Sequence, residues 1–190
     1  MSKYEVLDKI HSELEQSRFE RVLLFGADNV RYAGGITLPP LGTLIKEAVA
    51  VLLQPGEEPV IFVPAWLKET FRTNGTIANV QVYSGQGRAA SADLCKTVHT
   101  VLKRTGGDRS EIGITERRVS PALFSQLRSE LPKVNFTACD QWIASLRMVK
   151  TEYEQQLLIQ AARKTDHGLC GAGHHVMVYA ARPEKGLSEI

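Results

Sequence analysis

The stretch EAVAVLLQPGEEPVIFVP, residues 47–64, holds two short apolar runs separated by the polar segment Pro55-Gly56-Glu57-Glu58. Valine and isoleucine recur in these runs, as is typical of strands. In the segment between them, proline presets φ and glycine supplies a positive φ, which are the requirements of a tight turn. The stretch therefore predicts an antiparallel hairpin, and with it antiparallel pairing early in the sheet.

Further strands and helices are predicted on both sides of this hairpin. Short apolar runs predict the flanking strands, and after residue 89 strands alternate with amphipathic helices, which is typical of α/β proteins. We therefore expect an α/β fold with a mixed, partly antiparallel sheet flanked by helices. The predicted strands are 21–27, 79–85, 111–115 and 134–138, and the predicted helices are 3–17, 90–104, a helix that starts at Ser120-Pro121, and 139–147.

A long helix is predicted from Thr151 onward. Thr151 and Glu154 form a capping box, in which each side chain bonds to the backbone N–H of the other residue. Leu157 and Leu158 then begin an apolar face, and nothing downstream supplies a partner for it. We therefore expect residues 150–180 to self-associate or to be disordered.

The composition excludes several classes of protein. The 190 residues carry 23 Lys and Arg against 21 Asp and Glu, so no positive surplus is available for a nucleic-acid backbone. The longest apolar stretches are far shorter than the roughly 20 residues that cross a bilayer, and the N-terminus lacks the apolar core of a signal peptide. We expect a cytoplasmic protein without nucleic-acid or membrane partners.

Three widely spaced cysteines, Cys95, Cys139 and Cys170, are expected to be buried, reduced thiols.

One group of potential metal ligands occurs in the sequence. Asp166, His167, His174 and His175 lie within ten residues, and imidazoles with a carboxylate are ligands that zinc, manganese and cobalt use. Nearby glycines weaken a helix there, and no second set of ligands completes a shell. We therefore expect solvated or packed histidines, and no metal site in this chain.

The segment Gly85-Gln86-Gly87-Arg88-Ala89-Ala90 has the order of a dinucleotide-binding fingerprint, a glycine turn between a strand and a helix. The preceding strand, however, is polar for a strand buried on both faces and is not the first of the sheet. A plain loop is the simpler interpretation. A nucleotide-binding module that uses Gly85, Gln86 and Gly87 is kept as an alternative function.

Other polar residues are assigned structural roles. Asn29 tolerates the left-handed conformation of a turn, and Tyr32 can bury its ring while its hydroxyl keeps a hydrogen bond. Arg117 and Arg118 are expected to form a solvated charge pair rather than an anion site. No serine or cysteine has the neighbours that activate a nucleophile, so no catalytic residue is predicted.

Two stretches resemble a known family. LLFGADNVRYAGGITLPP (23–40) is similar to the strand, Asn-x-x-Tyr and glycine-containing turn near the start of the N-terminal domain of the creatinase, prolidase and aminopeptidase P proteins. WIASLRMVKTEYEQQLLIQAARKTDHGL (142–169) resembles the junction of that family, where an Arg-x-x-Lys-[Ser/Thr]-x-x-Glu run enters the catalytic "pita-bread" domain. The resemblance implies a ribonuclease H-like N-terminal domain over residues 1–147. A linker helix, the first of a catalytic domain that is cut short, is expected within 148–190.

The resemblance places the chemistry outside this chain. In the family, two divalent metal ions (Mn, Zn or Co) are held by carboxylates and one histidine of the second domain, beyond its first helix. The resemblance therefore implies that the fragment is inactive and contains no catalytic residue, metal ligand or cofactor. It implies that the parent protein is a metal-dependent hydrolase. The preferred substrates are Xaa-Pro peptides, cleaved by a dipeptidase or an aminopeptidase P-like enzyme, and a creatinase-like hydrolase is the other member of the family considered.

The same resemblance suggests a role for one loop. Family members are dimers or larger oligomers in which the N-terminal domain covers the catalytic groove of a neighbouring subunit. The resemblance implies that this groove is lined by Thr37, Leu38, Pro39 and Leu41, whereas the simpler interpretation of the loop is a turn that only connects two strands. The resemblance also implies that the partners are the chain's own catalytic domain and a second subunit. A non-catalytic relative that binds peptides or proteins is the other alternative.

Overall fold

The chain is described by a computed structural model that covers residues 4–35, 47–85 and 88–180. It divides into two compact units, residues 2–149 and residues 150–190. The described strands all belong to the first unit, whereas the second unit contains the long helix α7 (Glu152–Ala180).

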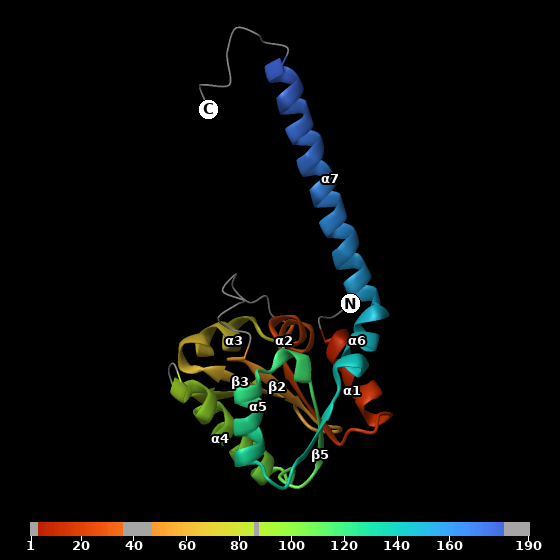
Figure 1. The fold of residues 1–190 in the computed structure, drawn as a ribbon. Helices are drawn as coiled ribbons and strands as arrows, with labels where there is room; N and C mark the ends of the chain where they lie inside the picture. The colour runs from red at the N-terminus through yellow and green to blue at the C-terminus, as the bar shows by residue number, and fades with distance from the viewer. Residues whose placement is uncertain (1–3, 36–46, 86–87, 181–190) are drawn as a thin grey trace. The chain divides into compact units, whose positions relative to one another are not determined.

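A mixed sheet forms the centre of the first unit (Figure 1). The described strands are β1 (Arg21–Phe25), β2 (Ala50–Leu53), β3 (Val60–Pro64), β4 (Asn79–Tyr83), β5 (Glu111–Ile114) and β6 (Asn135–Ala138), in the spatial order β4-β3-β2-β1-β5-β6. β2 pairs antiparallel with β1 and β3, whereas the pairs β1 with β5, β3 with β4, and β5 with β6 are parallel. The predicted hairpin is confirmed, since Val51 lies opposite Ile61 and Gly56 in its turn has a φ of +71°.

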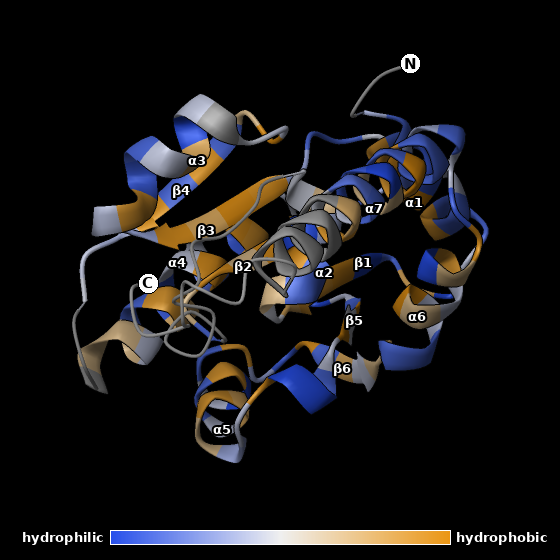
Figure 2. Cartoon of the chain, turned by 90° about the horizontal axis from the view of Figure 1, so that it is seen from above, coloured by the Kyte–Doolittle hydropathy of each residue, from blue (hydrophilic) through white to orange (hydrophobic). Residues whose placement is uncertain are grey.

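Helices cover both faces of this sheet. They are α1 (Glu5–Glu15), α2 (Ala27–Gly34), α3 (Lys68–Asn74), α4 (Arg88–Arg104), α5 (Pro121–Glu130) and α6 (Asp140–Met148), with the short 3-10 helices η1 (Ala65–Leu67) and η2 (Glu116–Arg118). One apolar cluster joins α1, α2, α3 and α6 to Val22 and Leu24 of β1, and the other joins α4 and α5 to Leu23 and Phe25. The hydropathy colouring of Figure 2 shows β1 largely hydrophobic, as expected for a strand covered on both sides. The predicted α/β class is therefore confirmed.

The helices α2 and α3 are not among the predicted elements. The left-handed turn expected at Asn29 is wrong, because Asn29 lies within α2 and only glycines have a positive φ among the described residues. α2 has eight residues and presents an apolar face to the core mainly through Val30 and Ala33. So short a segment carries too little periodicity to be recognised as a helix.

Both predicted helix starts are confirmed by their hydrogen bonds. Ser120 caps α5, where its hydroxyl oxygen accepts from the backbone N–H of Leu123 at 3.3 Å. In the second unit, Thr151 Oγ1 accepts from the N–H of Glu154 at 3.2 Å, while Glu154 Oε2 accepts from the N–H of Thr151 at 2.9 Å. This reciprocal pair is the capping box that the sequence predicts.

The described side chains of α7 are largely exposed. All of those from residue 155 to 170 are exposed, including Leu158 at 57% and Leu169 at 68%. Self-association through this segment stays a prediction. Within the described ranges, no helix combines the length and apolarity needed to cross a membrane.

The three cysteines differ in their surroundings. Cys95 and Cys139 are buried as predicted, but Cys170 is exposed on α7, so its predicted burial is wrong. The sequence could not show this difference, because residues of α7 pack only if another part of the protein covers them. Burial, with a smaller contribution from a nearby carboxylate, raises the pKa of Cys95 and of Cys139 to about 12. Both buried thiols are therefore protonated and unreactive at neutral pH.

A thiol-labelling experiment tests this arrangement. Ellman's reagent should label one thiol of the native chain within minutes and all three thiols only after denaturation, and Cys170→Ser should abolish the fast phase. Because folding raises the pKa of both buried thiols, their contribution to the free energy of unfolding should be constant below about pH 9 and should fall as the pH rises from about 9 towards 12. Fast labelling of a second thiol in the native chain would contradict the described core.

Candidate functional site

The parallel strands β1 and β5 end side by side at the point where the chain order of the sheet reverses. From β1 the sheet continues through β2, β3 and β4 on one side, and from β5 through β6 on the other. Ligands of open α/β sheets bind outside the carboxyl ends of strands at such a point. Thr115 links the two ends, since its hydroxyl accepts from Phe25 N at 2.7 Å and donates to Phe25 O at 3.2 Å. This edge of the sheet is therefore the candidate site.

Gly26 makes the turn from β1 into α2. Its φ is +93°, and a Cβ at this position would lie 2.9 Å from Asp28 Oδ1 and 2.9 Å from Arg118 Cγ. Only glycine combines this backbone conformation with so close an approach. The turn brings the first residues of α2 next to η2, which follows β5.

Four polar side chains meet beside this turn, and we call Asp28, Asn29, Arg118 and Arg147 the Asp28 cluster. Asp28 Oδ2 accepts from Arg118 Nη2 at 2.6 Å and from Arg147 Nη1 at 3.0 Å. Arg147 Nη1 also donates to Asn29 Oδ1 at 3.3 Å, and Asn29 Nδ2 donates to the carbonyl of Phe25 at 2.9 Å. The cluster therefore joins α2, η2 and the end of α6.

The charges of the Asp28 cluster keep its carboxylate ionised. Burial by itself raises the pKa of Asp28, but the hydrogen bond from Arg147 and the charges of Arg118 and Arg147 lower it more, so the pKa lies below its usual value. A carboxylate that is shared by two guanidinium groups is a weak base, and it is poorly placed to take a proton from a substrate. The cluster is suited to holding elements together.

The 3-10 helix that carries Arg118 is itself fixed by α6. The Asp140 carboxylate accepts from the backbone N–H of Glu116 at 3.0 Å and from that of Arg117 at 3.3 Å. The prediction of a solvated charge pair is wrong for Arg118, because its guanidinium binds Asp28. An ion pair between residues 90 positions apart in the chain has no local signature, and only the parallel pairing of β1 with β5 brings the two together.

The end of α6 is also fastened by α1 and α2. Tyr32 donates its hydroxyl to the carbonyl of Leu146 at 3.3 Å and packs its ring against the core, which confirms its predicted role. Lys9 donates to the same carbonyl at 2.6 Å and also to that of Val149. The guanidinium of Arg147 lies 6.0 Å from the Tyr32 ring centre. Carbonyls that have no partner within the helix are thus satisfied where the first unit ends.

The predicted groove residues lie outside the described residues: Thr37, Leu38, Pro39 and Leu41. The residues on either side of them are described. Before them, the carbonyl of Gly34 accepts from Thr76 N at 2.9 Å. After them, the Glu47 carboxylate accepts from the backbone N–H and the hydroxyl of Ser120 at 2.5 Å and 2.9 Å. The Glu47 contact has no local signature in the sequence, since Ser120 is 73 residues away.

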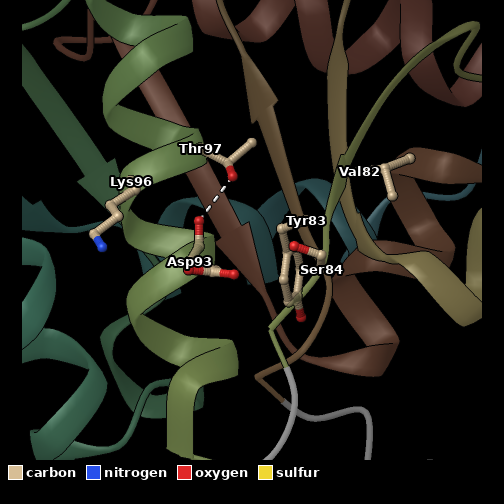
Figure 3. Close-up of a pocket in the computed structure, with 6 residues that line it drawn as sticks. All are labelled: Val82, Tyr83, Ser84, Asp93, Lys96 and Thr97. Carbon is tan, nitrogen blue, oxygen red and sulfur yellow. Dashed lines mark hydrogen bonds between the residues drawn. The ribbon is translucent and has the colours of Figure 1, made fainter.

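A separate pocket of about 220 Å³ lies between the end of β4 and α4 (Figure 3). It is lined by Val82, Tyr83, Ser84, Asp93, Lys96 and Thr97. Tyr83 donates its hydroxyl to the carbonyl of Ala48 at 2.6 Å, and burial raises the pKa of Tyr83 to about 12. Gly85 follows β4, whereas Gln86 and Gly87 lie outside the described residues. β4 lies at the edge of the sheet, away from the ends of β1 and β5, so its position does not favour the nucleotide-binding alternative.

The potential metal ligands do not form a site in the part of the chain that is described. There, no three side chains of His, Cys, Asp or Glu come together as metal ligands. Asp166 and His167 are exposed on α7. His174 and His175 belong to α7, but their side chains lie outside the described ones.

Comparison with known proteins identifies similar folds. Residues 7–149 match the family model "Creatinase/Prolidase N-terminal domain". Among solved structures, the Xaa-Pro dipeptidase from Bacillus anthracis aligns with 16% identity and a TM-score of 0.67, over 94% of this chain and 44% of its own. The prolidase from Pyrococcus horikoshii OT3 aligns with 20% identity and a TM-score of 0.62, over 90% of this chain and 42% of its own. No match was found among curated proteins.

A third structure covers only part of such a protein. The creatinase/prolidase N-terminal domain of an X-Pro dipeptidase from Streptococcus pyogenes aligns with 16% identity and a TM-score of 0.58, over 76% of this chain and 99% of its own. This chain therefore spans less than half the length of the first two structures and nearly all of the third. At these identities the likeness shows the fold.

The Asp28 cluster predicts a pH-dependent loss of stability. Asp28→Asn keeps the shape of the side chain but removes its charge, and should lower the free energy of unfolding by about 1 kcal/mol at pH 7. Because folding lowers the pKa of Asp28, the charge stabilises the chain above about pH 4 and its effect is lost as the pH falls through the folded value. Urea unfolding at pH 7 and at pH 3 measures this, with exposed Glu57→Gln as the control. An equal loss at both pH values would refute the role of the charge.

Two glycine substitutions separate backbone strain from close contact. Gly26→Ala should destabilise the chain by about 2–3 kcal/mol, because it combines a positive φ with a clash against Asp28 and Arg118. Gly56→Ala also places alanine at a positive φ, but nothing lies within 4 Å of the added Cβ, so it should cost only about 1 kcal/mol. Chemical denaturation of the two variants checks the difference. Equal losses would show that the contact with the cluster is unimportant.

Proposed function

The chain belongs to the creatinase/prolidase N-terminal domain family, and from this premise we propose that it is the non-catalytic N-terminal domain of a metal-dependent Xaa-Pro peptidase or creatinase-like hydrolase. Its role is to take part in oligomerisation and to line the substrate groove of a neighbouring subunit. Its partners are its own catalytic domain and that subunit. The names of the similar structures, an Xaa-Pro dipeptidase and a prolidase, support this choice of activity for the whole protein. The free cysteines suit a cytoplasmic location.

The metal ions belong to the second domain in this proposal. Two ions need several carboxylate and imidazole ligands at close range, and the described residues do not offer such a group. The described polar residues at the candidate site are instead paired with one another. The part of this chain in the reaction is to provide shape and contacts for the substrate.

The observation that carries the groove-lining role is the way in which residues 36–46 are flanked. Hydrogen bonds to Thr76 and Ser120 hold Gly34, two residues before this segment, and Glu47, directly after it. Glu47 and Ser120 adjoin the edge of the sheet where β1 and β5 end. A loop presents side chains to a ligand most effectively when rigid elements hold its base.

Two features of the second unit support the part of the proposal that joins this chain to a catalytic domain. α7 starts with a complete capping box and then exposes several large apolar residues, which need a cover. The Bacillus anthracis dipeptidase matches 94% of this chain, which is more than the first unit contains. The match therefore extends into the region of α7.

Kinetics of the complete gene product test the proposal. With added manganese it should hydrolyse Gly-Pro, an Xaa-Pro-Xaa tripeptide or creatine, whereas the 190-residue chain alone should hydrolyse none of them. Leu38→Ala/Leu41→Ala should raise KM about three- to tenfold with a smaller change in kcat, because uniform substrate binding is lost. Glu57→Ala, in the exposed turn between β2 and β3, is the matched control and should leave both constants unchanged.

Three outcomes contradict the proposal. Hydrolysis by the 190-residue chain alone would place the catalytic groups within it. An unchanged KM in the loop variant would remove the groove-lining role. A complete gene product that hydrolyses none of the three substrates but binds prolyl peptides would favour the alternative of a non-catalytic, peptide-binding relative.

A further inference from the structure

The outer edge of β4 has no partner strand among the described residues. β4 pairs with β3 through all five of its residues, and among the described residues no backbone hydrogen bond reaches its other edge. An edge strand directs alternate backbone N–H and C=O groups outward, where another strand can pair with them. The edge of β4 is therefore a surface for adding a strand.

β4 lacks the features that usually protect an edge strand. Its sequence, Asn-Val-Gln-Val-Tyr over residues 79–83, contains no charge and no proline. Val82 is 37% exposed, and Val80, on the same face of the strand, is half-buried. β6 at the opposite edge has no large exposed apolar residue. The exposed apolar surface on β4 therefore distinguishes it from the other edge.

The strand is complementary to itself. If two copies pair antiparallel about Gln81, Val80 of each copy lies opposite Val82 of the other, and the two Gln81 residues face each other. Such a pairing covers the exposed valine with an apolar neighbour and brings no like charges together. A two-fold axis of this kind is the commonest symmetry of homodimers.

One acidic and one basic side chain lie on the helix next to the strand. Asp93 and Lys96 lie on α4 and line the pocket next to β4, so this margin carries one negative and one positive group (Figure 3). A two-fold axis through Gln81 sets the two α4 helices antiparallel on one face of the joined sheet.

We propose that β4 is the contact between two copies of this chain, which pair antiparallel about Gln81 and form one continuous sheet. This proposal rests on the oligomerisation that the proposed function includes, and names the surface that produces it. The second copy is favoured over an unrelated peptide because the uncharged strand, with one valine on each side of Gln81, is complementary to itself.

A site-specific cross-link tests the pairing. In the background Cys170→Ser, Gln81→Cys should form a disulfide-linked dimer under mild oxidation, because directly opposite residues have Cβ atoms about 5 Å apart. Asn79→Cys in the same background is the matched control, since the two substituted residues would lie about 13 Å apart. We expect cross-linking of Gln81→Cys to be at least tenfold faster. Circular dichroism verifies that both variants fold.

Sedimentation velocity over a range of concentrations provides an independent measurement. The unmodified chain should show a reversible dimer. Val82→Lys should weaken it at least tenfold because two buried positive charges would flank the axis, and Val82→Thr, which is similar in shape and uncharged, should change the dissociation constant less than threefold.

The outcomes separate this proposal from the proposed function. A dimer that does not cross-link through Gln81→Cys, or that cross-links equally through Asn79→Cys, overturns the β4 contact but leaves oligomerisation standing. A chain that stays monomeric at all concentrations overturns the β4 contact and the oligomerisation role together. The kinetic effect of the residue 38 and 41 substitutions tests groove lining separately.

Discussion

The burial of β1 on both faces of the sheet is the constraint on which the rest of the structure depends. Its successive residues alternate between two apolar clusters, so helices are needed on each side. Its antiparallel pairing with β2 and parallel pairing with β5 place it at the point where the sheet reverses direction. Its carboxyl end is therefore the place where polar groups from several segments meet. Gly26 makes the tight turn after β1, and the hydroxyl of Thr115 links the ends of β1 and β5.

The Asp28 cluster follows from that geometry. A partly buried carboxylate needs charged hydrogen-bond donors, and Arg118 and Arg147 supply them from η2 and α6. Tyr32 and Lys9 satisfy the last carbonyls of α6 at the same time. Together these bonds fix the end of the first unit, from which the chain continues to α7. Polar groups that are paired with one another in this way hold elements of the fold together.

The motifs that identify the family also have physical roles in this fold. The Asn of Asn-x-x-Tyr binds the end of β1, and the Tyr binds the end of α6. The Arg of the junction motif closes the Asp28 cluster. Three residues of the candidate site, Asn29, Tyr32 and Arg147, therefore lie within motifs that the sequence alone reveals. The roles of Asp28 and Arg118 could not be predicted, because their ion pair spans 90 residues and has no pattern of its own.

Local patterns were sufficient for the hairpin, the starts of α5 and α7, the α/β class and the family, because turns, caps and strand runs depend on neighbouring residues. α2 and α3 were missed because their helical conformation depends on packing against the sheet, which short segments do not reveal. Three further features depend on the tertiary structure and not on local sequence. They are the exposure of Cys170, the hydrogen bonds between Glu47 and Ser120, and the position of β4 at the edge of the sheet. Contacts between residues far apart in the chain are set by the three-dimensional pairing of strands, and no single stretch of sequence encodes them.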